Sequence, residues 1–300
     1  MSLHVSINWE RVLANIVRTP PDYRQLISTE KAQRILRCSE SDFSALMRTD
    51  ACDHNSKFDA CDIWNIGLYS GSKRSRPELE MYYWRRTLAE SGWIGSKRFR
   101  FTIEARCPQG PACASTEWLR PEILGARRIE TVADRGRFLV TAEIEQAGRL
   151  GTISASEVRD AWRSVIAQYR FHYTYPKLAG SVTATRRRKV GDCVSLSRIL
   201  AEQLLGLGFQ ARVSHGYIWS GVAARPHGWV EVVDEDENWK ALDISMATLA
   251  ADFFTPDYAN FCFGSLLNRI IRVSDGRSAF VHSCGDDVLE VHSHMDVDFQ

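Results

Sequence analysis

The chain has 300 residues, of which 44% are hydrophobic, so it can form one large domain or two smaller ones with a packed core. Its 38 basic and 37 acidic residues nearly balance, which excludes a whole-protein field that would attract nucleic acid or an anionic membrane. No stretch approaches about 18 uncharged apolar residues, so we predict no membrane span.

The first residues lack the charged segment and apolar run of a secretion signal. The eight cysteines form no dense framework, so we expect reduced thiols and a cytoplasmic location. Cys52, His54 and Cys61 are close in sequence, but they include no CxxC pair and lack a clear fourth ligand. We therefore expect ordinary thiols rather than a metal site.

Residues 26–70 contain the pattern of two capped helices separated by a tight turn, followed by a short strand and an Asp-led helix. Ser28 or Thr29 can cap the first helix and Ser39 the second. This order resembles the helix-turn-helix of excisionase-type winged-helix domains. The resemblance implies a module that contacts DNA or a peptide; the alternative is a small helical domain with a solvated basic face.

Further along, the pattern predicts a helix over 77–90, a strand over 97–105 and a mostly helical segment over 121–148. A soft boundary falls near residue 150, and the alternative is a boundary nearer residue 95. We therefore expect a mainly helical N-terminal region, 1–150, and a second domain, 151–300.

The second domain begins with a strong helix signal. Ser154 and Glu157 have the spacing of a capping box. A loop of about a dozen residues is expected after Pro176, and it ends in the basic run 186–189, interpreted as a solvated surface.

Asp192 is placed to cap a helix that carries Cys193 in its first turn and ends at Gly206 or Gly208. The partial positive charge at a helix N-terminus stabilises a thiolate, and an adjacent imidazole strengthens that effect. A cysteine whose only role was to fill the hydrophobic core would be poorly placed in the first turn of a helix, directly after Gly191-Asp192. Cys193 is therefore the candidate nucleophile.

Two predicted strands, 226–233 and 239–244, are joined by an acidic turn. In a hairpin centred near residue 235, His227 and Asp243 face each other across the strands. The carboxylate would then fix the tautomer of the imidazole and leave its other nitrogen for the thiol. His215 is the competing imidazole; it lacks a paired carboxylate in this pattern, so we interpret it as structural.

Four segments together resemble the core of the transglutaminase-like superfamily: Gly191-Asp192-Cys193, Leu207 to Val213, His227 to Val232, and Trp239 to Asp243. The resemblance extends over about residues 155–280. It implies an α+β fold with a papain-like core, in which a helix bearing the cysteine packs on an antiparallel sheet.

The resemblance also implies roles: Cys193 as nucleophile, His227 as base and Asp243 as the group that orients the base. Gly228 stands where the family usually has Ala, and Ile244-Ser245 replace the usual Pro-Thr. Neither change removes a reacting group. The mechanism requires no metal and no organic cofactor.

Two features of the site remain open at this point. The backbone N–H of Cys193 is one candidate oxyanion donor, and Trp162 or Tyr173 are candidates for a side-chain donor. Some members of the superfamily are activated by calcium, for which the acidic cluster 234–237 is the candidate; a solvated turn is the other interpretation.

We therefore expect a cysteine-dependent acyl-transfer enzyme that attacks an amide or thioester and forms an acyl-enzyme on Cys193. Hydrolysis, as in a peptidase or amidase, is favoured because the sequence carries no sign of shielding a thioester from water. One alternative is a transglutaminase-type acyltransferase or amide synthase that tailors a peptide or a carrier-bound acyl group. The other is a non-catalytic DNA- or peptide-binding module. The expected partner is thus a peptide, protein or acyl-carrier substrate, with no membrane.

Overall fold

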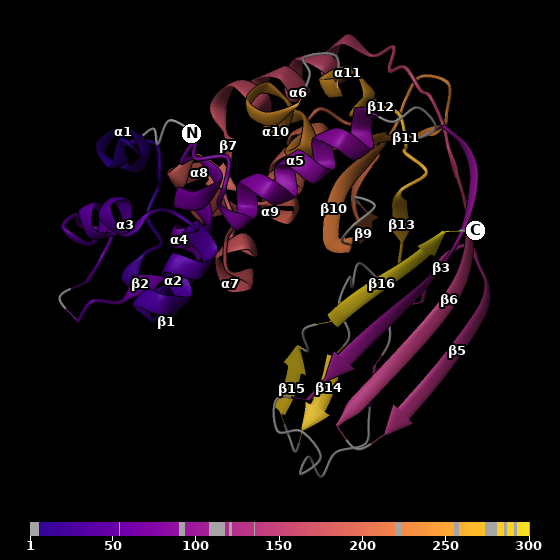
Figure 1. Ribbon diagram of the computed structural model, residues 1–300. Coiled ribbons are helices and arrows are strands. Elements are labelled where there is room, and N and C mark those ends of the chain that lie inside the picture. The colour runs from indigo at the N-terminus through magenta and orange to yellow at the C-terminus, as the bar shows by residue number, and fades with distance from the viewer. Residues whose placement is uncertain are drawn as a thin grey trace.

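The computed structural model describes residues 6–53, 55–89, 94–107, 118–119, 122–134, 136–219, 224–254, 258–273, 281–284, 287–290 and 293–299. These residues form a group of N-terminal helices, a central unit of helices on a five-stranded sheet, and a long four-stranded sheet (Figure 1). No helix in these ranges combines the length and the apolar character needed to cross a membrane.

The N-terminal group follows the predicted order of capped helices. Ser28, Ser39 and Asp59 each accept a backbone N–H three residues further on, which fixes the starts of three successive helices. The elements are α1 (Trp9–Leu13), a 3-10 turn (Pro21–Tyr23), β1 (Leu26–Ile27), α2 (Thr29–Leu36), α3 (Glu40–Met47), β2 (Phe58–Asp59), α4 (Ala60–Leu68) and α5 (Arg76–Ala89). β1 and β2 pair antiparallel.

The central unit carries the segments that resemble the transglutaminase-like core. Its helices and short connecting strands are α6 (Ser156–Gln168), β7 (Arg170–Phe171), α7 (Pro176–Ala179), α8 (Val182–Arg188), β8 (Val190–Gly191), α9 (Cys193–Gly206), α10 (Ile244–Phe253) and α11 (Tyr258–Phe261). The sheet has the order β12-β11-β10-β9-β13, and every neighbouring pair in it is antiparallel. Its strands are β9 (Ala211–Trp219), β10 (Ala224–Val233), β11 (Trp239–Leu242), β12 (Phe263–Gly264) and β13 (Ile270–Arg272).

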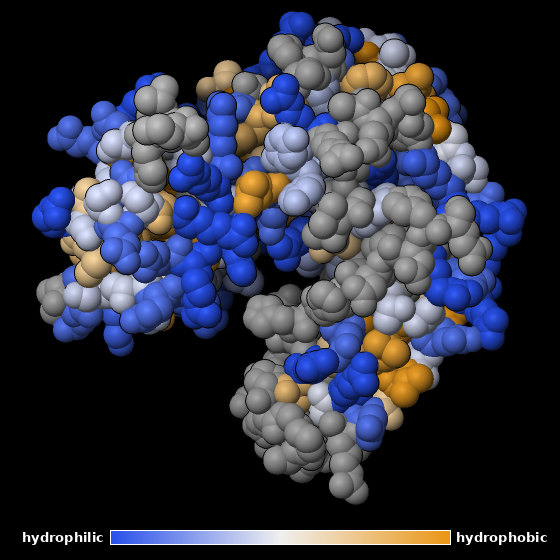
Figure 2. Space-filling model, in the orientation of Figure 1, coloured by the Kyte–Doolittle hydropathy of each residue, from blue (hydrophilic) through white to orange (hydrophobic). Residues whose placement is uncertain are grey.

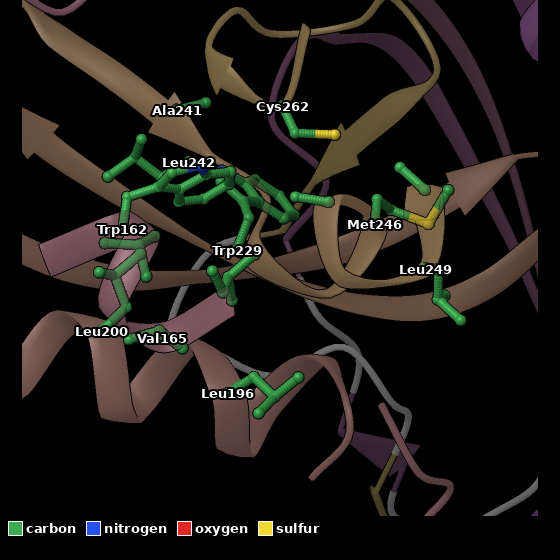
Figure 3. Close-up of a cluster of buried hydrophobic side chains, with 14 of the residues drawn as sticks. Trp162, Val165, Leu196, Leu200, Trp229, Ala241, Leu242, Met246, Leu249 and Cys262 are labelled. Atoms are coloured by element: carbon green, nitrogen blue, oxygen red, sulfur yellow. The ribbon is translucent and has the colours of Figure 1, made fainter. Parts of the chain in front are cut away.

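One hydrophobic core joins the helices to this sheet. Helix α9 packs against β9 and β10, with α6 and α10 beside it. Trp162, Leu196, Trp229 and Leu242 converge in this layer (Figure 3). The antiparallel sheet under a Cys-bearing helix is the arrangement expected from the sequence, and it fixes the start of α9 relative to β10.

Two local predictions in this unit are wrong. Residues 176–188 contain the short helices α7 and α8 rather than a loop, because Pro176 starts one helix and the Ser181 side chain caps the other. The start of α6 has no capping box. Its neighbouring N–H groups at Ser154 and Ala155 donate instead to the Asp234 carboxylate, at 2.9 and 3.2 Å.

The segment 121–148 was expected to be mostly helical, and this is also wrong. The second sheet has the order β16-β3-β6-β5 and contains β3 (Gly95–Arg106), β5 (Ala126–Asp134), β6 (Arg137–Gly148) and β16 (Ser293–Phe299). On β6, Phe138, Val140, Ala142 and Ile144 are buried alternately. This period of two is the signature of a strand, whereas the Ala, Glu and Arg content of the segment suits a helix.

The strand β16 joins the two sides of the proposed boundary at residue 150. It pairs with β3, so the end of the chain completes a sheet that begins before residue 150. A buried cluster also connects this sheet to the central one, with Val140 and Ile144 packed together with Tyr217 and Ile271. The division at residue 150 stays a proposal. The remaining short strands are β4 (Trp118–Leu119), β14 (Val281–Cys284) and β15 (Asp287–Glu290).

His172 connects the N-terminal residues to the central unit. Its Nε2 accepts the backbone N–H of Val17 at 3.3 Å, and its Nδ1 donates to the carbonyl of Phe171 at 2.6 Å. The ring is fully buried, and burial, assisted by the charges of Arg188 and Arg170, lowers the pKa of His172 to about 4. The neutral ring is therefore required, because a protonated Nε2 could not accept the Val17 N–H.

His172 predicts a dependence of stability on pH. The unfolded chain takes up a proton near pH 6.5 but the folded protein does so only near pH 4, so stability falls as the pH is lowered between these values. The loss amounts to about 3 kcal/mol over that window. Urea unfolding at pH 7 and pH 4.5 measures it. In His172→Gln, which can still accept from Val17, this contribution should vanish; equal pH slopes in both proteins would contradict the prediction.

Gly216 on β9 and Gly228 on β10 lie near each other, and we expect their replacement by alanine to have opposite effects on stability. A Cβ on Gly216 would lie 1.8 Å from the carbonyl oxygen of Ile271 on the paired strand, so Gly216→Ala must part β9 from β13. A Cβ on Gly228 would meet Val194 at 3.4 Å, an ordinary contact. We expect Gly216→Ala to lose about 1–3 kcal/mol or more and Gly228→Ala to gain about 0.4–1 kcal/mol.

Urea denaturation of the two variants beside the parent measures this difference. Gly228→Ala is the matched control, since it adds the same methyl group on the neighbouring strand. Equal stabilities of the two variants would show that the close approach at Gly216 imposes no constraint.

Candidate active site

The start of α9 fixes the position of Cys193. The Asp192 carboxylate accepts the N–H groups of Val194 and Ser195 at 3.1 and 2.9 Å, and the Ser195 hydroxyl accepts the N–H of Asp192 at 2.8 Å. This reciprocal capping box places Cys193 at the first helical residue, as predicted. A Cβ on Gly191 would lie 2.3 Å from the Ser195 hydroxyl, so glycine is required before the cap.

The His227 side chain contacts both other candidate residues. Its Nε2 lies 2.7 Å from Oδ2 of Asp243, and both side chains are buried. Cys193 also interacts with the ring, whose second nitrogen is not bound by Asp243. Burial opposes protonation of the ring, but the charge and hydrogen bond of Asp243 and the contact with Cys193 outweigh it and raise the pKa of His227 to about 10.

The strand positions that bring His227 and Asp243 together differ from the predicted ones. β10 pairs Val230 with Leu242, and the ladder ends there, so His227 and Asp243 are not cross-strand neighbours. His227 lies opposite Gly216 of β9, while Asp243 follows the end of β11 and is the N-cap of α10. The turn is centred one residue later than expected, with Glu237 in the left-handed region at φ 58°. When the centre of the turn moves by one residue, the residues paired between β10 and β11 change by two positions.

The Asp243 carboxylate is held from its other side. Oδ1 accepts the hydroxyl of Ser245 at 3.0 Å and the backbone N–H of Met246 at 3.1 Å, which leaves Oδ2 for His227. The N–H of Asp243 donates to the carbonyl of Cys262 at 2.9 Å. Ser245, a departure from the family pattern, therefore supplies a donor to the carboxylate.

The Trp229 ring is a member of the site that sequence reasoning missed. It stacks on His227, with ring centroids 6.2 Å apart and an interplanar angle of 22°. It is fully buried in the core (Figure 3). The sequence did contain a signal for Trp229: it lies two residues after His227 on one strand, and side chains at that spacing share a face of the sheet.

His215 lies across from Gly228 on β9, and burial, with the charge of Arg198, lowers its pKa.

Of the two candidates for a side-chain oxyanion donor, one lies near the thiol. Trp162 packs in the core against Phe263, with ring centroids 5.5 Å apart (Figure 3). Tyr173 lies within electrostatic reach of Cys193 and Glu80, and burial is the main cause that raises its pKa. Its hydroxyl therefore stays protonated and can donate a hydrogen bond.

Residues of α4 hold Tyr173 in place. The Asn65 side chain accepts the N–H of Tyr173 at 2.7 Å and donates to its carbonyl at 3.0 Å. The Trp64 ring meets the Tyr173 ring edge-on, with centroids 5.4 Å apart. A further link comes from α5, whose Glu80 pairs with Arg225, two residues before His227. The N-terminal helices thus contact Tyr173 and Arg225, close in sequence to the candidate site.

The other thiols differ from Cys193 in their surroundings. Burial raises the pKa of Cys38 to about 11 and that of Cys61 to about 12, and it also raises the pKa of the fully buried Cys262.

The sequence raised the question of a metal site at Cys52, His54 and Cys61. Cys52 and Cys61 are free thiols, while His54 lies outside the described residues. Among the residues placed by the structure, no three His, Cys, Asp or Glu side chains are grouped to hold a metal ion.

The acidic turn does not fit calcium. Asp234 accepts the hydroxyl and N–H of Ser154 and the ammonium of Lys240, the last at 2.6 Å. Burial opposes its ionisation, but the Lys240 ammonium and the donors of Ser154 and Ala155 hold the pKa of Asp234 well below its usual range. Asp236 also pairs with Lys240, at 2.9 Å. These carboxylates are neutralised from within the chain.

Comparison with known families agrees with this geometry. Residues 146–244 match the family model described as the transglutaminase-like superfamily. This part of the chain is a transglutaminase-like domain. The matched range includes Cys193, His227 and Asp243, and it confirms the resemblance drawn from the sequence. In broad terms, the domain is that of a cysteine-dependent enzyme.

Several solved structures are distantly similar. A proposed cysteine protease from Cytophaga hutchinsonii is 11% identical, with a TM-score of 0.37, and the match covers 68% of this chain and 91% of that one. The periplasmic domain of TgpA from Pseudomonas aeruginosa is 10% identical, with a TM-score of 0.28 and coverages of 57% and 92%. A structure described as a TGase is 14% identical, with a TM-score of 0.24 and coverages of 40% and 44%. No curated protein sequence matches the chain.

Proposed function

We propose that the protein is a cysteine-dependent acyl-transfer enzyme that hydrolyses an amide or thioester of a peptide or protein. One observation carries the proposal: a cysteine at the first residue of a capped helix meets an imidazole whose other nitrogen is 2.7 Å from a buried carboxylate. Cys193 is the nucleophile, His227 the acid and base, and Asp243 the residue that orients the ring. This is the arrangement of a Cys-His-Asp triad.

Acylation uses the charges that this arrangement favours. The helix N-terminus and the protonated His227 stabilise the Cys193 thiolate. The thiolate attacks the carbonyl carbon, and the carbonyl electron pair moves to oxygen. When the tetrahedral intermediate collapses, the bond to nitrogen or sulfur breaks and the leaving group takes the proton from His227. The acyl group is then held on Cys193 as a thioester.

Deacylation returns the enzyme to its starting state. Neutral His227 accepts a proton from water as the water oxygen attacks the thioester carbonyl. The C–S bond breaks, Cys193 leaves as a thiolate, and the imidazolium is restored. Cys193 is partly exposed, so water can reach the thioester, which favours hydrolysis. The alternative acceptor is an amine, which would make the protein a transglutaminase-type acyltransferase or an amide synthase.

Two donors are proposed for the oxyanion. The carboxylate of Asp192 accepts the N–H groups of Val194 and Ser195, which leaves the N–H of Cys193 at the helix end for the substrate oxygen. The Tyr173 hydroxyl, held by Asn65 and Trp64, is the proposed side-chain donor.

The non-catalytic alternative is less favoured. The first turn of α3, which would approach nucleic acid in a helix-turn-helix, carries the exposed Glu40, whose carboxylate would repel phosphates. Salt-dependent retention of DNA by the full chain would support that alternative.

The thioester intermediate gives a direct test of function. With the benzyl thioester of N-acetylglycine as donor, we expect a mass increase on Cys193 after an acid quench and release of N-acetylglycine. Cys193→Ala should lower the rate at least about 1,000-fold, whereas Cys52→Ala, which removes a thiol outside the site, should leave it unchanged. Equal rates in the two variants and no adduct on Cys193 would overturn the proposal.

Adding a primary amine to the same reaction separates hydrolysis from transfer. We expect N-acetylglycine to remain the main product when glycine methyl ester is present. A main product in which the acyl group is joined to the amine would replace hydrolysis by the acyltransferase alternative.

Tyr173→Phe tests the proposed oxyanion donor. It keeps the ring that packs on Trp64 but removes the hydroxyl, so we expect kcat to fall about 100-fold with little change in KM. Tyr175→Phe is the matched control, because its hydroxyl binds Asp59 rather than facing the site. If steady-state kinetics give equal kcat values for both variants, Tyr173 is not the donor.

A further inference from the structure

A cavity of about 830 Å³ is lined by residues other than the candidate catalytic ones. Its walls come from four parts of the chain: α1 with its preceding residues, the turn and first residues of α3 (residues 38–42), the segment after α4, and β7. None of Cys193, His227 and Asp243 lines it. The volume is within the range of sites that bind small organic molecules.

The charge of this cavity is strongly positive. Arg11, Lys73, Arg74 and Arg170 line it, against the single carboxylate of Asp42. Among the described residues, no ion pair within 4 Å joins any of these four cations to a carboxylate. Asp42 instead accepts the N–H of Ile7 at 3.2 Å and the hydroxyls of Ser6 and Ser39.

The segment that carries Lys73 and Arg74 is held in a defined conformation. Gly71 and Lys73 have left-handed backbones, with φ of 68° and 59°. The hydroxyls of Ser70 and Ser72 donate to the carboxylate of Glu78, at 3.1 and 2.6 Å. A left-handed backbone costs free energy at a residue other than glycine, and the hydrogen bonds within the turn offset that cost at Lys73.

On the opposite side, Arg170 is oriented by its neighbours. Its guanidinium lies over the ring of Tyr69, 5.4 Å from the centroid, and donates to the side chain of Asn15 at 2.9 Å. Ile7, Val12 and Tyr69 add apolar and aromatic wall beside the cations. The cavity therefore offers both oxyanion-binding groups and apolar wall.

We propose that this cavity binds a phosphate ester of nucleotide size. Guanidinium groups match phosphate oxygens with paired N–H donors, and the ammonium of Lys73 adds a compact charge. The Tyr69 and Val12 wall receives the organic part of the ligand. The face over the N-terminal helices is largely hydrophilic, which suits a polar ligand that exchanges with solvent (Figure 2). The site is separate from the proposed acyl-transfer function.

Isothermal titration of the full chain at 50 mM salt tests this with three probes. We expect ATP to bind, pyrophosphate to bind about tenfold or more weakly, and adenosine alone not to bind measurably. Equal affinity for ATP and pyrophosphate would assign the cavity to inorganic polyphosphate and overturn the nucleotide-size assignment. Absence of ATP binding at millimolar concentration would overturn the site altogether.

The double substitution Lys73→Glu with Arg74→Glu identifies the cavity as the site. We expect it to raise the Kd for ATP at least tenfold. Arg48→Glu changes an exposed arginine at the C-cap of α3, outside the cavity, and should alter the Kd less than twofold. Raising the salt to 200 mM should weaken binding to the parent protein. Equal Kd values in the two charge-reversed proteins would place binding elsewhere. An unchanged acylation rate at Cys193 in the double variant shows that it is folded.

Discussion

The buried contact between His227 and Asp243 places the strictest demand on this fold. An imidazolium and a carboxylate removed from water are stable only when both are fully paired. The second oxygen of Asp243 is therefore bound by Ser245 and the N–H of Met246, and the imidazole meets Cys193 and the Trp229 ring. Because Asp243 is also the N-cap of α10, one carboxylate both starts that helix and orients the histidine.

The N-terminal helices are attached to the central unit by several polar contacts. Asn65 binds the backbone of Tyr173 on both sides, Val17 donates to His172, and Glu80 pairs with Arg225. These contacts attach the helices to the strand and loop that run past the thiol. A ligand in the cavity beside Tyr69 would lie next to the same segment, since the Tyr69 hydroxyl donates to the carbonyl of Phe171.

Sequence reasoning succeeded where the determining contacts are local. The caps of α2, α3 and α9 each depend on a side chain within three residues of its partner, so their patterns are visible along the chain. It failed at the start of α6, where Asp234 binds the preceding N–H of Ser154 from 80 residues away. It failed also over 121–148, where Ala, Glu and Arg favour a helix but pairing with β3 and burial of alternate residues impose strands.

The sequence by itself determined the transglutaminase-like domain, the thiol at a helix start, and the identity of the three side chains that meet. The tertiary structure decided how they meet. The turn is centred one residue later than its composition suggested, so Asp243 reaches His227 from beyond the end of β11 rather than from a paired strand position. Only the packed structure distinguishes Tyr173 from Trp162 as a neighbour of the thiol and assembles the basic cavity, because residues far apart in the chain surround each of them.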